Sequence, residues 1–329
     1  MYKFAKFILP LSILPAGTLF GATVIKGDGI TTYFAPGVSF ESGWHDADKD
    51  WNAETQSWNG DGEMCWASQA SCMAAYWQDW YVKAGNSLGA NVPKTASEIF
   101  NTYKANWTNK GGLSEFGLPW YFTGQMPQNY YTNLYNFPNS WSQKKGSGGA
   151  YFKELYPNPA SFVAGTLFTL HNNFDGDGVG GLQQSEFTEI LKDLICNQDC
   201  VIGLSLEFWG NTAAGQEGGL YSGHAVTLWG FDVNDATGLV TAVHITDSDD
   251  KHYGLTTYSV GNGYYGYDTE FPDYLGENVR DKYWTLTHSF YSLSVKDFAD
   301  LVVVPEPSLF AFFAGTLALL LAGTRRRRA

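Results

Sequence analysis

The chain has 329 residues, of which 44% are hydrophobic, 16% aromatic and 16% charged, and its formal net charge is −13. This composition is too apolar and aromatic for a disordered protein, and the negative charge argues against a nucleic-acid binder, which needs a basic surface for the phosphates. Four cysteines are too few for a small disulfide-stabilised scaffold. The length allows one large domain with a sizeable buried core.

Residues 1–22 have the layout of a secretory signal peptide. Lys3 and Lys6 precede an apolar stretch from Phe7 to Leu14, and small residues follow up to Ala22. The apolar stretch is too short to span a bilayer. We therefore expect the protein to be exported and residues 1–22 to be removed.

Residues 303–329 form a second targeting segment. Pro305-Glu306-Pro307 precedes an apolar run from Leu309 to Gly323, and four arginines follow at 325–328. This order resembles the PEP-CTERM sorting signal of certain Gram-negative bacteria, whose tail an exosortase recognises and removes at the membrane. The resemblance implies an exosortase-type partner, transient anchoring through a transmembrane helix, and a location in the cell envelope, at the outer surface or in the medium. The alternative is a plain C-terminal anchor, although the apolar run is barely long enough to span a bilayer.

Between these ends, helical patterns come first. Residues 23–59 are predicted to form loops with short extended pieces, and Cys65–Lys83 a helix, because small and aromatic residues recur there without Gly or Pro. Further helices are expected at Lys94–Ala105 and Glu186–Leu194. The segment 107–150 is rich in Gly, Asn, Pro and aromatic residues, which predicts long loops or short strands.

Extended patterns dominate after Cys200. Gly, Asn and Asp separate five β-branched or aromatic runs, which are predicted strands. These runs are Val201–Phe208, Ala225–Val233, Leu239–Thr246, Leu255–Val260 and Tyr283–Leu293. Helices followed by an antiparallel sheet predict an α+β domain over residues 23–302.

Cys65 is the first candidate for a catalytic residue. It begins a predicted helix after the turn-like stretch Asn59–Gly62, and a thiol at the positive end of the helix dipole favours the reactive thiolate form. The alternative is a cysteine that only fills apolar space. Cys72 lies about 10.5 Å further along the helix axis, too far for a disulfide, so Cys65 is expected to be a free thiol. The sequence leaves open whether Cys196 and Cys200 pair with each other.

His224 is a candidate for the base that activates this thiol. It is predicted at the mouth of the strand Ala225–Val233, and Asp247 and Asp249 follow the next strand with their side chains on one face. A carboxylate at the end of a neighbouring strand can accept a hydrogen bond from the imidazole and fix its tautomer, as in a catalytic triad. The alternatives are an ordinary strand-edge histidine and a solvated acidic turn.

Together these residues resemble the Mac/IdeS-type cysteine peptidases, papain-like enzymes known from streptococci as immunoglobulin-cleaving proteins. The resemblance spans roughly residues 43–295. It is carried by Gly43-Trp44 through Lys49 to Asn52, by Met64-Cys65, and by the block His224–Asp249 with Leu228-Trp229-Gly230 and Thr246-Asp247-Ser248-Asp249. The resemblance implies a papain-like fold and an endopeptidase that hydrolyses peptide bonds of a protein substrate without a required cofactor.

Site roles also follow from the resemblance. It implies Cys65 as the nucleophile and His224 as its base and later general acid. Asp247 orients His224 in this scheme, and Asp249 supports the same corner. Lys49 takes the place of a lysine that stabilises the oxyanion together with the backbone N–H of Cys65, a charge that develops only towards the transition state. Composition alone favours a salt-bridged loop lysine at this position.

The sequence also departs from the family. Trp66 follows the nucleophile, as in papain itself, where the streptococcal enzymes carry a small residue. The central region is also unusually aromatic, where a substrate-recognition surface can differ, and an exosortase-type tail is not typical of bacteria that meet antibodies, so immunoglobulin specificity is not implied. Two other functions stay open: a relative that cleaves or transfers a non-protein amide or acyl group, and a non-catalytic surface module that binds polysaccharide or protein through the aromatic-rich segment 115–141.

One motif suggests a structural Ca²⁺. Asn173–Gly178 resembles the opening of a calcium loop, with Asp175, Asp177 and Glu186 as ligands in one reading frame. Neither of the two frames completes the ligand pattern. The alternative is an Asp-Gly turn before a helix.

Overall fold

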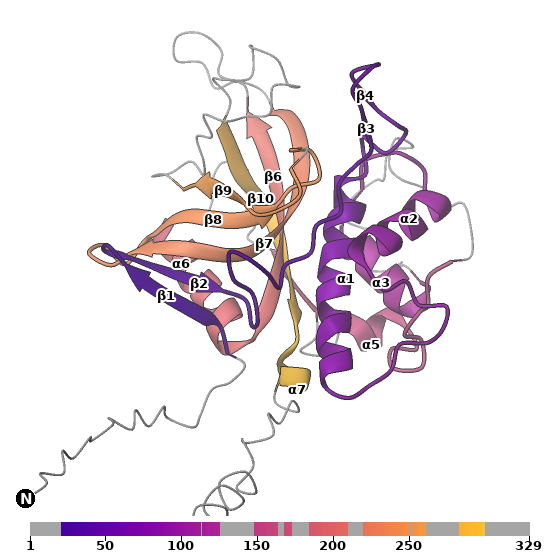
Figure 1. The fold of residues 1–329 in the computed structure, drawn as a ribbon, viewed down its shortest axis with the longest axis horizontal. Helices are drawn as coiled ribbons and strands as arrows, with labels where there is room; N and C mark the ends of the chain where they lie inside the picture. Colours follow the sequence, from indigo (N-terminus) through magenta and orange to yellow (C-terminus); the bar gives the residue numbers. More distant parts are fainter. Residues whose placement is uncertain are drawn as a thin grey trace, which may run out of the picture. The chain divides into compact units, whose positions relative to one another are not determined.

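An antiparallel sheet lies at the centre of the structure, which is a computed structural model (Figure 1). The structure describes residues 21–112, 114–125, 148–163, 168–172, 184–209, 220–250, 252–260 and 283–299. All of them belong to one unit, Gly21–Val302. The predicted signal peptide, the predicted sorting tail, and Asp175 and Asp177 of the predicted calcium loop lie outside the described residues.

Eight of the described strands form the sheet in the order β1-β2-β7-β6-β10-β5, with β8 paired to β7 and β9 paired to β8. Their bounds are β1 Thr23–Gly27, β2 Ile30–Phe34, β5 Phe168–Asn172, β6 Cys200–Trp209, β7 Leu220–Asn234, β8 Val240–Thr246, β9 Thr256–Ser259 and β10 Tyr283–Ser294. The long strand β7 organises the sheet, because β6 and then β2 pair along one of its edges and β8 pairs along the other. Gly230 of β7 lacks a side chain where Phe34 of β2 packs, since a Cβ there would lie 2.3 Å from the Phe34 ring.

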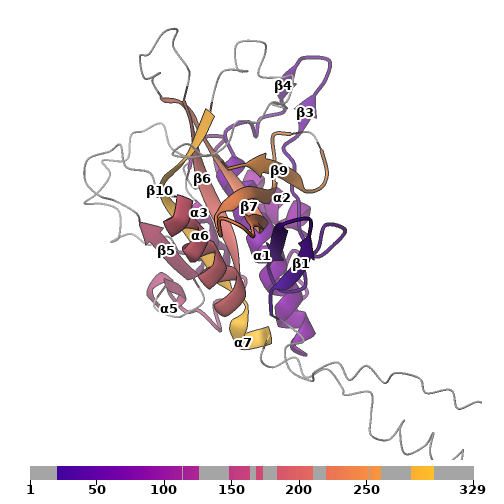
Figure 2. The same ribbon diagram turned by 90° about the vertical axis from the view of Figure 1, so that its left-hand side faces the viewer.

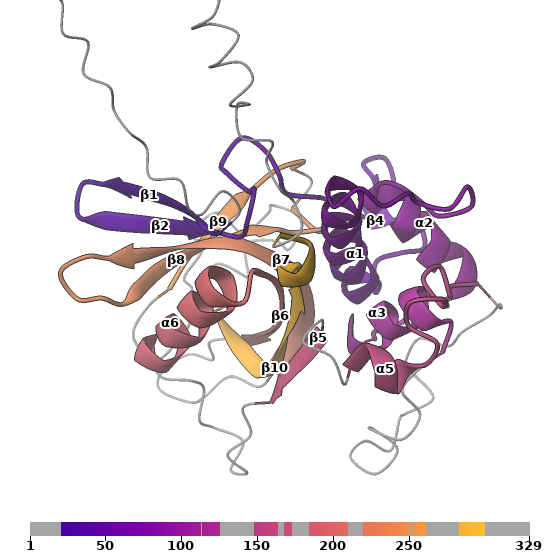
Figure 3. The same ribbon diagram turned by 90° about the horizontal axis from the view of Figure 1, so that it is seen from below.

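Helices cover both faces of the sheet (Figures 2 and 3). The helical segments are α1 Cys65–Lys83, α2 Ala96–Asn106, α3 Ser114–Thr123, α5 Pro159–Val163, α6 Gln184–Lys192 with a π-helical continuation Asp193–Asn197, and α7 Lys296–Ala299. Helix α1 packs against β6 and β7, with α2 and α3 beside it, and α6 packs on the opposite face. A separate hairpin, β3 Trp51–Asn52 and β4 Ser57–Trp58, precedes α1.

Alternation along β7 assigns its side chains to the two faces. Val226 and Leu228 pack in the apolar cluster under α6, whereas the Trp229 ring contacts Tyr76 of α1. The amide of Gln69, which α1 places against the sheet, donates to the carbonyl of Val226 at 2.6 Å and to a carbonyl of β6 at 2.8 Å. Apolar packing and buried hydrogen bonds therefore both fix α1, the helix that begins with Cys65, on the sheet.

The α+β class is confirmed, since helices and an antiparallel sheet make up the described fold. The predicted order is only partly right, because β1 and β2 precede the helices and belong to the same sheet. The predicted helix Cys65–Lys83 has the observed bounds, and those at 94–105 and 186–194 differ from α2 and α6 by a few residues. All five predicted strands are present.

The prediction of loops or short strands throughout 107–150 is wrong, because it contains α3. Gly117 and Pro119 disfavour a helix by intrinsic propensity. Burial of Trp120, Tyr121 and Phe122 overrides that preference. Gly117 is also needed here, since a Cβ would lie 3.1 Å from the Ala70 side chain of α1. Among the described residues, no helix combines the length and apolar character that crossing a membrane requires.

Candidate catalytic site

Cys65 is the first residue of α1 and is half-buried. A tight turn leads into the helix, with the Met64 N–H donating to the Asp61 carbonyl at 2.9 Å. No side chain caps this helix start at Met64. The first N–H groups of a helix have no carbonyl partner within it, so this end offers donors to a negative group beside Cys65.

The loop that carries Lys49 runs along the end of β8. The Thr246 hydroxyl donates to the His45 carbonyl at 3.0 Å, and the Lys49 N–H donates to the Ser248 carbonyl at 3.1 Å. The Asp46 carboxyl accepts a hydrogen bond from the Gly254 N–H at 2.9 Å. These contacts place the Lys49 loop next to the turn that carries Asp247 and Asp249.

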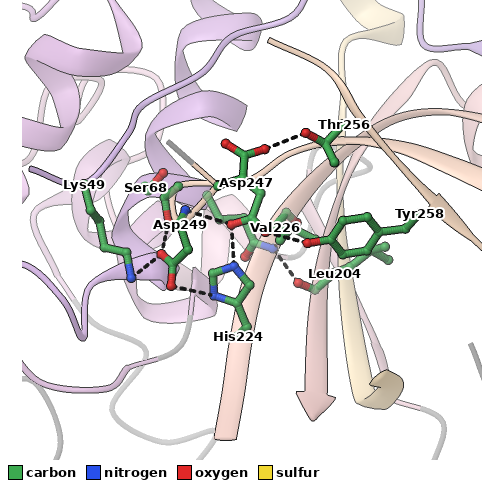
Figure 4. Close-up of polar contacts among 12 residues, drawn as sticks. Lys49, Ser68, Leu204, His224, Val226, Asp247, Asp249, Thr256 and Tyr258 are labelled. Atoms are coloured by element: carbon green, nitrogen blue, oxygen red, sulfur yellow. Dashed lines mark hydrogen bonds and ion pairs between the residues drawn. The ribbon is translucent and has the colours of Figure 1, made fainter. Parts of the chain in front are cut away.

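The Lys49 side chain is almost completely buried and forms an ion pair with Asp249 (Figure 4). Its ammonium also donates to the Gly62 carbonyl at 2.7 Å and lies 4.8 Å from the centre of the Trp58 ring. Burial by itself lowers the pKa of a lysine, but the negative charges of Asp249 and Cys65 outweigh burial and raise the pKa of Lys49. Lys49 is therefore a fixed cation beside the thiol.

His224 lies inside β7, opposite Leu206, rather than at the mouth of the strand as predicted, because β7 begins at Leu220. Its Nε2 lies 2.6 Å from Oδ1 of Asp247, and its Nδ1 lies 4.0 Å from Oδ2 of Asp249 (Figure 4). The Cys65 side chain is close enough to the imidazole to help raise the pKa of His224.

The surroundings of His224 favour the imidazolium form. Burial lowers the pKa of an imidazole, but the charges of Asp247 and Asp249, the hydrogen bond with Asp247 and the nearby Cys65 raise the pKa of His224 well above its ordinary value. The His224 side chain is 7% exposed, so these charges act in a poorly solvated place. A proton on His224 is thus stabilised next to a thiol.

Asp247 follows β8 directly and is buried. Its Oδ1 accepts a second hydrogen bond, from the Asp249 N–H at 2.9 Å, and its Oδ2 accepts one from the Tyr258 hydroxyl at 2.7 Å. Burial would raise the pKa of the carboxyl, but the charge of His224 and these hydrogen bonds hold it well below its ordinary value. Asp247 therefore stays ionised.

The structure brings together all five residues that the sequence assigned to catalysis, from the Lys49 loop, α1, β7 and the turn after β8. Sequence reasoning missed Trp58 and Tyr258. Neither belongs to a motif, and an aromatic residue in a short strand is usually a packing residue. Only their contacts with Lys49 and Asp247 distinguish them.

A metal ion is a second chemistry that such a group allows. One ligand atom each from His224, Asp247 and Asp249 lies within 4.8 Å of the others. The buried ammonium of Lys49 already sits on Asp249, and it would repel a metal cation there. The cluster therefore suits a proton and an ammonium better than a metal. Glu186 of the predicted calcium loop is an exposed residue in the first turn of α6.

The other three cysteines are protonated thiols. Cys196 and Cys200 are not bonded to each other, and both are free thiols, as is Cys72. Burial raises the pKa of Cys196 to about 11 and that of Cys200 to about 12, and it raises the pKa of the fully buried Cys72 well above its ordinary value. These three thiols therefore stay protonated near neutral pH.

The aromatic segment 115–141 gives little support to a sugar-binding surface where it is described. Phe116, Trp120, Tyr121 and Phe122 are all buried, and the rings of the last three pack against one another or against aromatic rings of α1 and α2. Residues 126–141 lie outside the described residues. No protein-family model matches the chain, and no curated protein matches it.

Proposed function

We propose that the protein is an exported papain-like cysteine endopeptidase of the Mac/IdeS type that uses Cys65, His224 and Asp247 as its triad. The observation that carries the proposal is the clustering of these groups: Asp247 is hydrogen-bonded to His224 at 2.6 Å, and Cys65 lies close enough to His224 and Lys49 to help raise the pKa of both. A thiol at a helix start, paired with an imidazole that a buried carboxylate orients, is the arrangement of an activated nucleophile. A nucleophile helix packed on an antiparallel sheet also supports a papain-like fold.

Acylation starts from the thiolate of Cys65 and the imidazolium of His224. The sulfur attacks the peptide carbonyl carbon, and the carbonyl oxygen becomes an oxyanion. The C–N bond then breaks, and His224 gives its proton to the leaving amine, which leaves a thioester on Cys65. Because Asp247 occupies Nε2, we assign this proton transfer to Nδ1.

Deacylation reverses the role of His224. The neutral imidazole takes a proton from a water molecule as the water oxygen adds to the thioester carbonyl. The C–S bond then breaks, which releases the carboxylic acid product and restores the thiolate beside the imidazolium. Asp247 stays ionised throughout and holds the ring in one tautomer.

Lys49 and the helix start stabilise the oxyanion in this mechanism. An ammonium has three N–H donors, and Asp249 and the Gly62 carbonyl take two of them. We assign the third N–H of Lys49 and the backbone N–H of Cys65 to the oxyanion. Both donors are fixed before the reaction, so they stabilise charge that appears only in the transition state.

Export and tail processing belong to the same proposal. A signal peptide at 1–22 and a PEP-CTERM-type tail at 303–329 would deliver the enzyme to the cell envelope, where an exosortase-type enzyme removes the tail. The substrate is a protein outside the cytoplasm. No nucleic acid and no cofactor are required by the mechanism, and calcium at the 173–186 segment would be structural.

Alkylation of Cys65 by iodoacetamide tests the proposal without a substrate. The raised pKa values of the other three thiols keep them slow, so intact mass reports one fast site. We expect a single fast label at pH 7, because the imidazolium of His224 stabilises the attacking thiolate. His224→Ala slows this labelling.

His244→Ala is the matched control. His244 is also buried and paired with a carboxylate, Asp232, at 3.0 Å, but no contact links it to Cys65 in the described structure. We expect this variant to label as the wild type does. Equal labelling of the wild type and His224→Ala across the pH range would contradict the proposal. Degradation of an unfolded protein substrate by the wild type, and its loss in Cys65→Ser, tests the reaction itself.

A further inference from the structure

Tyr258 joins the apolar core to the candidate triad. It lies in β9 opposite Val243 of β8, is 3% exposed, and belongs to the apolar cluster of the sheet. Its hydroxyl reaches Asp247, where it donates to Oδ2 at 2.7 Å (Figure 4). The ring is thus held by packing, while the hydroxyl takes part in a polar site.

The Asp247 carboxylate has three donors from three parts of the chain. His224 of β7 and the Asp249 N–H of the adjoining turn both meet Oδ1, and Tyr258 of β9 meets Oδ2. A carboxylate with donors on one oxygen can still rotate about its Cβ–Cγ bond. A donor on the second oxygen fixes the plane of the group, and with it the direction of the bond to His224.

We infer that Tyr258 is a positioning residue of the site, whose hydroxyl holds Oδ2 of Asp247 so that Oδ1 stays aligned with Nε2 of His224. The effect on hydrolysis rests on the proposed function. The alignment itself concerns only the Asp247–His224 pair and can be measured without turnover.

The negative charges around Asp247 explain why the hydrogen bond from Tyr258 matters. Asp48 and Asp250, and above about pH 8 also Asp46, carry like charges near Asp247, which oppose its ionisation. The hydrogen bond from Tyr258 stabilises the ionised form of Asp247 against them. The other charged or titratable groups that face the pair are Asp249 from the turn after β8, Lys49 from its loop and Cys65 from α1.

Tyr258→Phe removes one hydroxyl and keeps the packed ring. A less firmly held Asp247 stabilises the imidazolium less, so His224 loses its proton at lower pH. We expect the NMR titration midpoint of His224, and the basic limb of Cys65 alkylation, to fall by about one pH unit. In peptide hydrolysis we expect kcat to fall about tenfold, with KM nearly unchanged.

Tyr103→Phe is the matched control. Tyr103 is fully buried, and its hydroxyl donates to the Gly117 carbonyl at 2.7 Å in the contact between α2 and α3. Like Tyr258→Phe, this variant loses one buried tyrosine hydrogen bond, and its free energy of unfolding should fall by a similar amount. We expect its His224 titration and kcat to equal those of the wild type, which separates positioning from general loss of stability.

A folded Tyr258→Phe protein with the same His224 midpoint as Tyr103→Phe would overturn the inference. If the His224 midpoint shifts in Tyr258→Phe but the wild-type protein cleaves no peptide, the positioning role is supported and only the proposed function is contradicted. If Tyr258→Phe does not fold, the wild type still decides. The Tyr258 hydroxyl proton of the wild type should be protected from exchange, and its NMR signal should shift as His224 titrates. A hydroxyl proton that exchanges freely, or whose signal does not follow His224, would overturn the inference.

Discussion

Changing Asp249 to asparagine keeps the shape of the side chain but leaves the buried ammonium of Lys49 without its counter-charge. The Lys49 side chain is 1% exposed and that of Asp249 is 17% exposed, so water can do little to solvate the lysine. Breaking a buried ion pair on one side costs about 3–5 kcal/mol. Because the Gly62 carbonyl still accepts from Lys49, we expect the lower end, about 3 kcal/mol.

Lys49→Met removes the other partner and should cost less. The remaining Asp249 is partly exposed and accepts a hydrogen bond from the Ser248 hydroxyl at 3.1 Å, so we expect a loss of about 1–2 kcal/mol. The double variant buries no unpaired charge. Its loss should therefore be smaller than the sum of the single losses by about 2–3 kcal/mol.

Urea unfolding of the four proteins at pH 7, followed by tryptophan fluorescence, measures this coupling. Lys192→Met is the control, because Lys192 pairs at 3.5 Å with a Glu189 side chain that is 76% exposed, and its loss should change stability by less than about 0.5 kcal/mol. If the Lys49 and Asp249 losses simply add within about 0.5 kcal/mol, the pair is not the buried ion pair that the argument requires.

Three further predictions concern the fold around the site. Gln69→Leu leaves two sheet carbonyls buried without their donor, so urea unfolding should show a loss of about 2–4 kcal/mol, and a loss below about 1 kcal/mol would contradict the contacts. Burial and like charges raise the pKa of Asp46 to about 8, so its carboxyl favours folding only while protonated, and wild-type stability falls as the pH rises from about 4 to about 8. Asp46→Asn still accepts a hydrogen bond from the Gly254 N–H but cannot ionise. In urea unfolding, its stability minus that of the wild type should therefore be larger at pH 9 than at pH 5. An equal difference at both pH values would be evidence against the raised pKa of Asp46. Gly230→Ala should cost about 1–3 kcal/mol in thermal unfolding because its Cβ meets the Phe34 ring, and an unchanged melting temperature would mean that the ring moves freely.

The sequence predicted those elements whose signals are local. The bounds of Cys65–Lys83 follow from a long helical pattern without Gly or Pro, and α2 begins with a capping box in which Thr95 and Glu98 bond each other's backbone. The five later strands follow from β-branched runs between turn residues. The same reasoning failed at α3, because Gly117 and Pro119 oppose a helix locally and only burial against α1 makes it form.

The candidate site divides in the same way. Residue types and their order along the chain, together with the family resemblance, were enough to choose Cys65, His224, Asp247, Asp249 and Lys49. They did not determine the partners of these residues: the ion pair of Lys49 with Asp249, the hydroxyl of Tyr258 on Asp247, or the place of His224 inside β7. Such contacts join segments far apart in the chain, and their strength depends on burial and on charges from other elements. Sequence alone determined the candidate chemical groups and the local elements that carry them, whereas the tertiary structure decided their distances and their charge states, because both arise only when the sheet and α1 pack together.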